Sequence, residues 1–509
     1  MYSKLHSFGF IGIDAFLVQV EVDISQGMPS FDIVGLPDAS VKEARDRIRS
    51  SLKNNQYKNP MAKITVNLAP ADIKKIGSVY DLPILIGILI ASGQLSGDFN
   101  NSAFIGEISL SGDVKKIYGV LPMVIKSKEL GITDIYIPAD NALEGSVVKG
   151  VNIYPIRHIK DIINHFDNTL KLNTIAPYKY SPQPNCCDLD FRDVKGQFQA
   201  KRALEIAAAG EHNVLLIGPP GSGKSMLAKR IPSILPPMTF DESIETTKIH
   251  SISGNLNNKS PLIVNRPFRS PHHTTSTAGL SGGGSNPCPG EISLAHNGVL
   301  FLDELPEFSR PTLEILRQPI EDCVITIARA KAKITYPCSI MLVAAMNPCL
   351  CGFFGHPTKK CTCSIGSVNK YLNRVSGPLL DRLDIHVEVL PVEYSDLSSK
   401  EKSESSESIK NRVITARKIQ IDRYKSSPIT SNSKLTSNLI QKYCTLSPDA
   451  NAILKGAFEK MGLSARTYDK ILKVARTIAD LDSSNIIDFQ HIAEALQYRN
   501  LDRKYWRNV

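Results

Sequence analysis

The sequence predicts an α/β protein of several domains built around a nucleotide-binding core. With 509 residues the chain is too long for one hydrophobic core and should form about three domains of ordinary size. An apolar run at residues 214–217 leads into a glycine-rich loop and then a helical segment, the strand–loop–helix unit of parallel α/β folds. Beyond residue 409 the apolar spacing is that of helices.

The first 165 residues mix strand and helix patterns. Strands are expected near residues 16–22, 64–67, 103–108 and 135–137, and helices near 40–53, 80–92 and 120–130. The segment at 112–138 resembles the small (S5-like) α/β domain of Lon proteases. In that register the catalytic lysine falls on Leu121 and the serine on Val79, with Ser78 one place early. Leucine cannot accept a hydroxyl proton, so a Lon-protease-like fold without protease chemistry is expected.

Three further divisions are expected along the chain. Residues 166–186, rich in Pro, Tyr, Ser and Asn, are predicted to be a linker. Residues 187–394 are predicted to form an AAA+ P-loop core with a cysteine-rich insertion at 349–363, and 395–509 a helical lid.

The glycine-rich loop reads G-P-P-G-S-G-K-S and fits the phosphate-loop pattern G-x-x-x-x-G-K-[ST] at every fixed position. Its glycines permit a tight turn whose backbone N–H groups point at phosphate oxygens. Lys224 is expected at the β- and γ-phosphates, and Ser225 at Mg²⁺. The alternative is a surface turn, which would leave the flanking strand and helix unexplained. The predicted ATP contacts are Gly218, Pro219, Pro220, Gly221, Ser222, Gly223, Lys224, Ser225 and Met226.

Two later apolar runs end in polar side chains. One ends at Asp303 and Glu304, which are predicted to hold Mg²⁺ and to polarise the attacking water, respectively. The other ends at Asn347, which is predicted to orient that water and sense the γ-phosphate. The alternative for Asn347 is a cap on the turn before Pro348.

An alternating strand pair at residues 325–335 carries Arg329, Lys331 and Lys333. That spacing predicts three positive charges on one face, suited to a nucleic-acid backbone. A solvated hairpin is an equally good interpretation of the sequence.

Four cysteines occur within fifteen residues, at Cys349, Cys351, Cys361 and Cys363. Their C-x-C pairs suit tetrahedral Zn²⁺, although C-x-x-C is the more usual spacing. Reduced cysteines in a turn are the alternative. The chain has ten cysteines and no secretory signal, which favours thiols or metal ligands over disulfides.

Three arginines are candidates for contacts with the γ-phosphate. Arg382, in S-G-P-L-L-D-R-L-D, resembles the arginine finger of ring-forming ATPases, with Arg374 as second choice. Arg466, in S-A-R at the start of a lid helix, is the expected second sensor. For Arg382 the alternative is a salt bridge within its own subunit, and for Arg466 a solvated side chain.

The charge balance is mildly basic, with 60 Lys and Arg against 50 Asp and Glu. This is compatible with a polyanionic partner and does not prove one. The longest apolar stretch, residues 82–91, is too short to span a bilayer, so a cytoplasmic protein without membrane contact is expected.

Together, these motifs resemble the YifB/ComM family of magnesium chelatase-like AAA+ ATPases. The pieces that carry the likeness are D-F-R-D-V-K-G-Q, the phosphate loop, R-P-F-R-S-P-H-H, N-G-V-L-F-L-D-E-L-P-E-F, A-A-M-N-P-C, S-G-P-L-L-D-R-L-D and G-L-S-A-R. The resemblance implies a hexameric ATPase that uses ATP and Mg²⁺ to drive branch migration of DNA in recombination or natural transformation, on branched or single-stranded DNA.

The AAA+ resemblance also places Val194 and Gly196 against adenine, where helix capping and core packing are the alternatives. Two other functions compete with the DNA motor. One is the motor subunit of a metal chelatase, and the other is an ATP-dependent protease, which Leu121 opposes.

Overall fold

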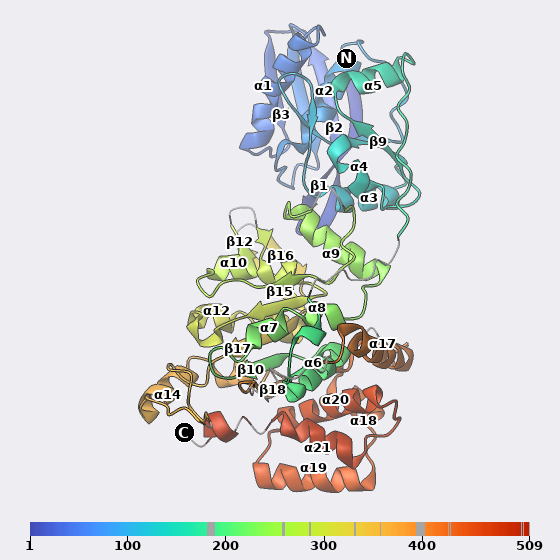
Figure 1. The fold of residues 1–509 in the computed structure, drawn as a ribbon. Helices are drawn as coiled ribbons and strands as arrows, with labels where there is room; N and C mark the ends of the chain where they lie inside the picture. The colour runs from blue at the N-terminus through green and yellow to red at the C-terminus, as the bar shows by residue number, and fades with distance from the viewer. Residues whose placement is uncertain are drawn as a thin grey trace. The chain divides into compact units, whose positions relative to one another are not determined.

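The computed structural model describes residues 1–180, 189–256, 260–284, 287–329, 332–356, 358–392, 403–425, 427, 429–499, 501 and 503–507. The chain divides into two compact units, coloured along the chain in Figure 1. The first consists of Met1–Ser181 and Phe240–Ile263, and the second of Pro182–Thr239 and Val264–Val509. The chain therefore passes between the units three times.

The first unit is built on a seven-stranded mixed sheet in the order β3-β4-β2-β1-β5-β8-β9. Its strands are β1 (Tyr2–Ile11), β2 (Asp14–Ser25), β3 (Ser30–Val34), β4 (Lys63–Ala69), β5 (Ser102–Phe104), β8 (Asp134–Pro138) and β9 (Asn152–Ile156), with a separate pair β6 (Glu107–Ile108) and β7 (Val114–Lys115). Its helices include α1 (Ala39–Asn54), α2 (Asp81–Ala91), α3 (Val120–Glu129), α4 (Ala142–Gly145) and α5 (Ile159–Phe166). The other helices and strands expected from the sequence in this part are confirmed, but the strand expected at residues 103–108 is divided into β5 and β6, which belong to different sheets.

In the first unit, the apolar segments of the sequence are the buried ones. Helix α2 is apolar on all sides, and ten of its eleven residues are buried. Leu121 and Val79 are also buried, at 0% and 7% exposure. Ser78, the hydroxyl nearest to the Lon serine position, is hydrogen-bonded to Glu107. These contacts include no lysine that could serve as the base of a serine–lysine dyad.

Helix α9 (Phe240–Ile252) belongs to the first unit, although the sequence places it inside the predicted ATPase core. It packs against α3, and the buried Ser251 hydroxyl bonds the Glu144 carboxylate at 2.5 Å. Glu144 also accepts the backbone N–H of Leu121. Burial raises the pKa of Glu144, and these donors partly offset that effect. Such pairing is invisible in the sequence because its partners are 107 residues apart.

The second unit contains a five-stranded parallel sheet in the order β11-β14-β17-β10-β18. The strands are β10 (Val214–Ile217), β11 (Phe268–Arg269), β14 (Val299–Leu302), β17 (Met341–Met346) and β18 (Ile385–Glu388). All residues of β10, β14 and β17 are buried, as expected for strands covered on both faces. Because the strands run in parallel, the residues that follow them meet at one edge.

Short helices and two small ribbons surround this sheet. The helices are α6 (Phe198–Gly210), α7 (Lys224–Ala228), α8 (Ile231–Ile234), α10 (Thr277–Ser281), α11 (Glu291–Leu294), α12 (Arg310–Glu314), α13 (Arg317–Asp322), α14 (Ile365–Leu372) and α15 (Gly377–Leu380). The ribbons pair β12 (Gly282–Gly283) with β13 (Cys288–Pro289), and β15 (Val324–Arg329) with β16 (Ala332–Pro337).

The expected C-terminal helices are also present, as α17 (Ser406–Arg423), α19 (Pro448–Met461), α20 (Ala465–Leu481) and α21 (Phe489–Gln497). A further helix, α18 (Ser437–Tyr443), was not predicted. Helices α18, α19, α20 and α21 lie together in Figure 1. Helices α17 and α20 pack on α6, which joins the lid helices and the sheet in one hydrophobic core.

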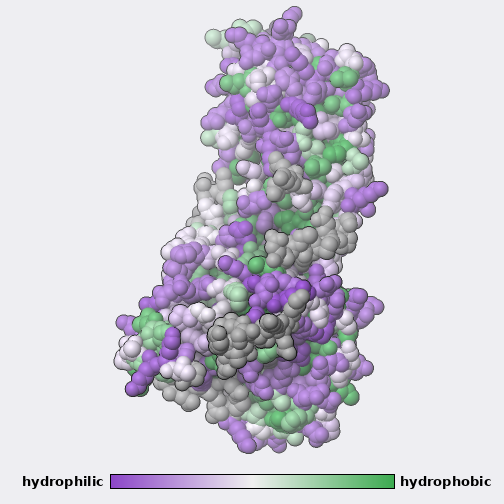
Figure 2. Space-filling view, viewed as in Figure 1, coloured by the Kyte–Doolittle hydropathy of each residue, from purple (hydrophilic) through white to green (hydrophobic). Residues whose placement is uncertain are grey.

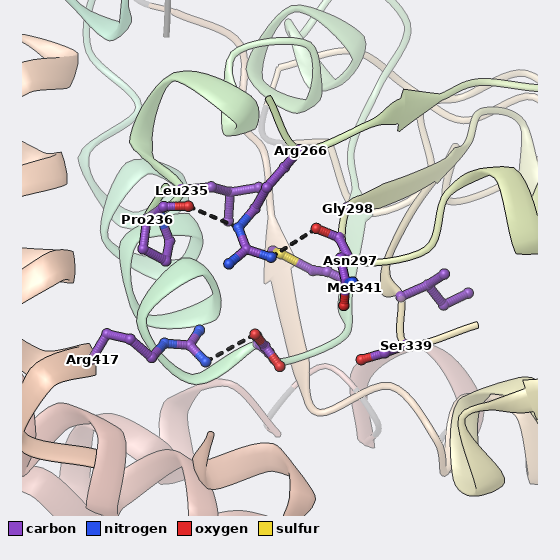
Figure 3. A pocket seen from close by; sticks show the side chains of 10 residues that line it. Leu235, Pro236, Arg266, Asn297, Gly298, Ser339, Met341 and Arg417 are labelled. Atoms are coloured by element: carbon purple, nitrogen blue, oxygen red, sulfur yellow. Dashed lines mark hydrogen bonds and ion pairs between the residues drawn. The ribbon is translucent and has the colours of Figure 1, made fainter. Parts of the chain in front are cut away.

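Glu211 ties this lid to the sheet. Its carboxylate pairs with Arg417 of α17 at 2.9 Å and with Lys434 at 3.2 Å. Across the pocket that Arg417 and Arg266 line, Arg266 donates to the backbone oxygens of Pro236 and Asn297 at 2.7 and 2.8 Å (Figure 3). Although burial alone would raise the pKa of Glu211, the surrounding cations hold it well below its usual value.

Polar residues cover most of the face of the molecule seen in Figure 2. Within the described part of the chain, no helix combines the length and the apolar character needed to cross a membrane.

Candidate nucleotide-binding site

The glycine-rich loop connects β10 to α7 and has the backbone geometry of a phosphate cradle. Gly221 and Gly223 have φ of +76° and +91°, a region that glycine enters without strain. At Gly218 a Cβ would lie 2.2 Å from the Val389 carbonyl oxygen, so only glycine fits beside β18. The first N–H groups of α7 have no acceptor within that helix, so they are available to an anion. Met226, on the same short helix, is 38% exposed.

Lys224 lies over this loop. Its Nζ donates to the carbonyls of Gly218 and Pro219 at 2.8 and 2.9 Å, and to Asn347 Oδ1 at 3.2 Å. The Ser222 hydroxyl lies 3.5 Å away. Burial lowers the pKa of Lys224 to about 8, and Asp303 offsets part of that shift. The ammonium is thus buried with little compensating charge, which suits it to a phosphate ligand.

Ser225 and Asp303 form the second part of the site. Ser225 Oγ donates to Asp303 Oδ2 at 2.5 Å, which joins the start of α7 to the end of β14. A hydroxyl and a carboxylate oxygen are ligands that Mg²⁺ accepts beside phosphate and water. The donor set therefore fits Mg²⁺ bound together with a nucleotide.

Glu304 follows Asp303 in a left-handed conformation with φ of +52°. Its carboxylate lies 3.3 Å from His273 Nδ1, and the His273 ring packs 4.0 Å from that of His272. His273 is a site residue that the sequence analysis missed. The H-H pair in R-P-F-R-S-P-H-H was the available signal, but nothing local indicates a partner 31 positions along the chain.

The two predicted adenine contacts, Val194 and Gly196, have different surroundings. Val194 is fully buried in the hydrophobic core, which favours the core-packing interpretation of this residue. Gly196 has φ of +61° and precedes Gln197, whose side chain amide donates to the backbone oxygens of Ser222 and Leu390 at 3.2 and 2.5 Å. Gln197 thus connects the entry segment to the phosphate loop, a contact that the sequence does not reveal.

Family models match nearly the whole chain. The model described as "Magnesium chelatase, subunit ChlI" matches residues 190–397, "Subunit ChlI of Mg-chelatase" matches 20–141, and "Magnesium chelatase, subunit ChlI C-terminal" matches 403–499. YifB of Salmonella typhimurium is 43% identical over 98% of this chain and 97% of its own. The competence protein ComM of Haemophilus influenzae is 44% identical over the same shares.

The chain belongs to the YifB/ComM family of magnesium chelatase-like proteins. Membership of this AAA+ family implies ATPase activity with ATP and Mg²⁺, in agreement with the loop and the two acids. The chain is also 26% identical to Lon protease 2 of Bacillus subtilis over 162 residues, or 29% of each chain.

The YifB/ComM chain keeps Arg382 and Arg466 away from its own phosphate loop. Both pair with Glu321 of α13, at 2.8 and 3.3 Å. Both also line a pocket of about 410 Å³ with Asn213 and Asp384, which directly precede β10 and β18. This pocket lies at the amino edge of the sheet, whereas the loop lies at the carboxyl edge.

The two edges are well separated, because the five residue-to-residue steps from Asn213 to Gly218 span about 16 Å in a strand. Arg466 pairs with Glu321 at the edge opposite its own loop, and its role as second sensor remains a prediction. Arg374 lies elsewhere, 2.9 Å from Glu307, just beyond the two acids of β14.

The hairpin of β15 and β16 does not place its basic positions on one face, as the sequence predicted. Strands β15 and β16 pair Arg329 with Ala332 and Ala328 with Lys333. Because opposed residues share a face, the pairing puts positions 329 and 333 on opposite faces of the ribbon, not on one. Lys333 is exposed, and Lys331 lies outside the described residues.

The four cysteines converge just after β17. All four sulfur atoms lie within 4.8 Å of one another. Cys349 is buried, and the others are partly exposed. This is the one such group of cysteine, histidine or acidic ligands found in the described part of this family member.

Proposed function

We propose that this protein is an ATP-driven DNA motor that hydrolyses ATP at the subunit interfaces of a hexameric ring. The observation that carries the proposal is the division of the catalytic groups between two edges of one sheet. Lys224, Asp303, Glu304 and Asn347 gather at the carboxyl edge. Arg382 lies at the amino edge.

That division favours a head-to-tail ring. A nucleotide held by one copy would be completed by Arg382 and Arg466 from its neighbour, after both guanidinium groups leave Glu321. Head-to-tail interfaces close into rings when the rotation between copies permits it. In the single chain both arginines remain in salt bridges, the alternative raised by the sequence for Arg382.

The proposed substrate is DNA, in branched or single-stranded recombination intermediates, and the proposed process is branch migration. Support comes from the competence protein ComM of Haemophilus influenzae, which is 44% identical, and from the net charge of +10. Arg329, Lys331 and Lys333 remain the predicted DNA contacts, on a hairpin rather than a single charged face. A DNA motor of this kind would work in the cytoplasm, where ATP and the chromosome are found.

A strand-exchange assay tests the proposal. The purified protein, ATP and a synthetic four-way junction should yield branch-migration products, and DNA should stimulate ATP hydrolysis. Lys224→Ala should abolish both, because it removes the cation that lies over the phosphate loop. Hydrolysis without products on three- and four-stranded junctions would refute the DNA motor, and leave the ATPase.

The motor subunit of a magnesium-chelatase-like complex is the second candidate, since all three family models carry the ChlI description. A chelatase motor would be stimulated by a porphyrin-binding partner and not by DNA. We also propose Zn²⁺ as a structural cofactor, bound by the four cysteines.

A further inference from the structure

The four-cysteine segment, residues 349–363, is called the cysteine knuckle below. Its sulfur atoms have the spacing of a tetrahedral metal site. Cys349 Sγ lies 3.3 Å from Cys351 Sγ and 3.7 Å from Cys361 Sγ, and the last two are 3.5 Å apart. A Zn–S bond of about 2.3 Å gives a tetrahedron with edges of about 3.8 Å. The distances exceed the disulfide bond length of about 2.05 Å.

Backbone N–H groups surround the sulfurs. The N–H of Phe354 donates to Cys349 at 3.3 Å, and Cys351 accepts from Phe353 and Thr362. Such donors stabilise thiolates, the form in which cysteine binds Zn²⁺. Two C-x-C pairs would supply the four sulfur ligands of a structural zinc site. The N–H···S bonds would hold those ligands in place.

The knuckle touches the phosphate loop directly. A Cβ on Gly352, whose φ is +83°, would lie 2.3 Å from Cδ of Pro220. The space between the knuckle and Gly218–Pro219 is a cavity of about 10 Å³, which is at the lower limit for one water molecule. The loop and the knuckle are therefore in close contact at Pro220 and Gly352.

Both ends of the knuckle lead to groups connected to Asn347. Cys349 follows Asn347 by two residues, at the end of β17. Helix α14 follows Cys363, and its buried Tyr371 hydroxyl is hydrogen-bonded to the backbone of Asn347. Asn347 in turn accepts a hydrogen bond from Lys224. The knuckle thus contacts Pro220 directly, and it is joined at one end to Asn347 and at the other to the helix whose Tyr371 bonds Asn347.

We infer that the cysteine knuckle binds one Zn²⁺ and that the metal-bound knuckle positions Pro220 and Asn347 for nucleotide binding. Apart from Cys349, the knuckle's cysteines are only partly buried, so its shape depends on the metal bonds rather than on a hydrophobic core. This inference rests on the proposed nucleotide site. It assigns a positioning role to residues that touch neither ATP nor Mg²⁺.

Metal content and nucleotide affinity of the full chain test the inference together. Inductively coupled plasma mass spectrometry should find about one zinc per chain. Cys361→Ser with Cys363→Ser should lose the zinc and weaken binding of a fluorescent ADP analogue roughly 10-fold or more. The matched control, Cys288→Ser, removes an exposed cysteine outside the knuckle and should change neither. Circular dichroism should show that all three proteins keep their helix content.

A second variant tests the contact between Gly352 and Pro220 separately from zinc binding. Gly352→Ala keeps all four cysteines but places a methyl group against Pro220, so it should retain zinc and lose nucleotide affinity. Gly366→Ala is its control, because a Cβ there meets no atom within 4 Å.

Three outcomes would overturn the inference: iron in place of zinc, disulfides between these cysteines, or zinc loss with unchanged nucleotide affinity. Failure of the proposed function would look different. In that case the wild-type protein would hold zinc and still bind no nucleotide.

Discussion

The pKa of Lys224 makes nucleotide affinity depend on pH. Burial lowers this pKa to about 8, because the ammonium loses its hydration, and the Asp303 carboxylate offsets only part of that shift. A bound phosphate should raise the pKa, so binding of a nucleotide takes up a proton at this site. The affinity should therefore be highest below pH 8 and should fall as the pH rises through that value.

The size of the effect follows from the fraction of Lys224 that is protonated. With a pKa of about 8 in the free protein, the dissociation constant should rise about 8-fold between pH 7.5 and 9, or about 1.2 kcal/mol. The assay is titration of a fluorescent ADP analogue without Mg²⁺. Without the metal, neither hydrolysis of the metal ion at high pH nor metal binding by Ser225 and Asp303 affects the measured affinity. The β-phosphate has already lost its protons in this range.

Lys224→Arg is the control, since a guanidinium does not lose its proton in this range. Its affinity is expected to be lower but independent of pH. An equal decline in the wild type and in Lys224→Arg would refute the reasoning, as would a flat wild-type profile. Either result would mean that Lys224 already carries its full charge before the nucleotide binds.

Three further predictions concern groups that act at a distance from the loop. His273→Ala should lower kcat about 10-fold to 100-fold with little change in nucleotide affinity, because Glu304 loses the contact that orients its carboxylate. Arg382→Ala and Lys224→Ala should each be inactive alone and recover part of the ATPase activity when mixed, since each site would combine groups from two copies. Asp480→Ala should lower the free energy of unfolding by about 3 kcal/mol or more, because it leaves buried arginines unpaired.

Each of these has a distinct contradictory result. An unchanged kcat in His273→Ala would mean that its contact with Glu304 has no role in hydrolysis. A mixture as inactive as its components would argue against shared sites. For stability, Asp482→Ala is the control, because this carboxylate is 44% exposed and should cost little on thermal unfolding.

The phosphate loop, the acids of β14 and Asn347 could be predicted because each is a local pattern. A strand, a turn and a helix adjacent in sequence specify the loop, and parallel strands bring their carboxyl ends to one edge. The cysteines could be predicted for the same reason, since four thiols within fifteen residues must lie close together.

Other features depended on contacts between distant residues. Glu321 draws together Arg382 and Arg466, which are 84 positions apart, and so puts both at the edge opposite the loop. Helix α9 packs with the first unit through Ser251 and Glu144. The register in which β15 pairs with β16 decides which faces positions 329 and 333 occupy, and the alternation of residue types did not specify it.

The sequence by itself determined the family, the α/β class and the chemistry of the nucleotide site, because glycine, lysine, serine and acid side chains at set intervals act through backbone geometry alone. Only the tertiary structure decided which edge of the sheet each arginine lies on, and that the cysteine knuckle rests against Pro220. Those facts arise when side chains from separate segments compete for the same partner or the same volume, and neither competition leaves a pattern along the chain.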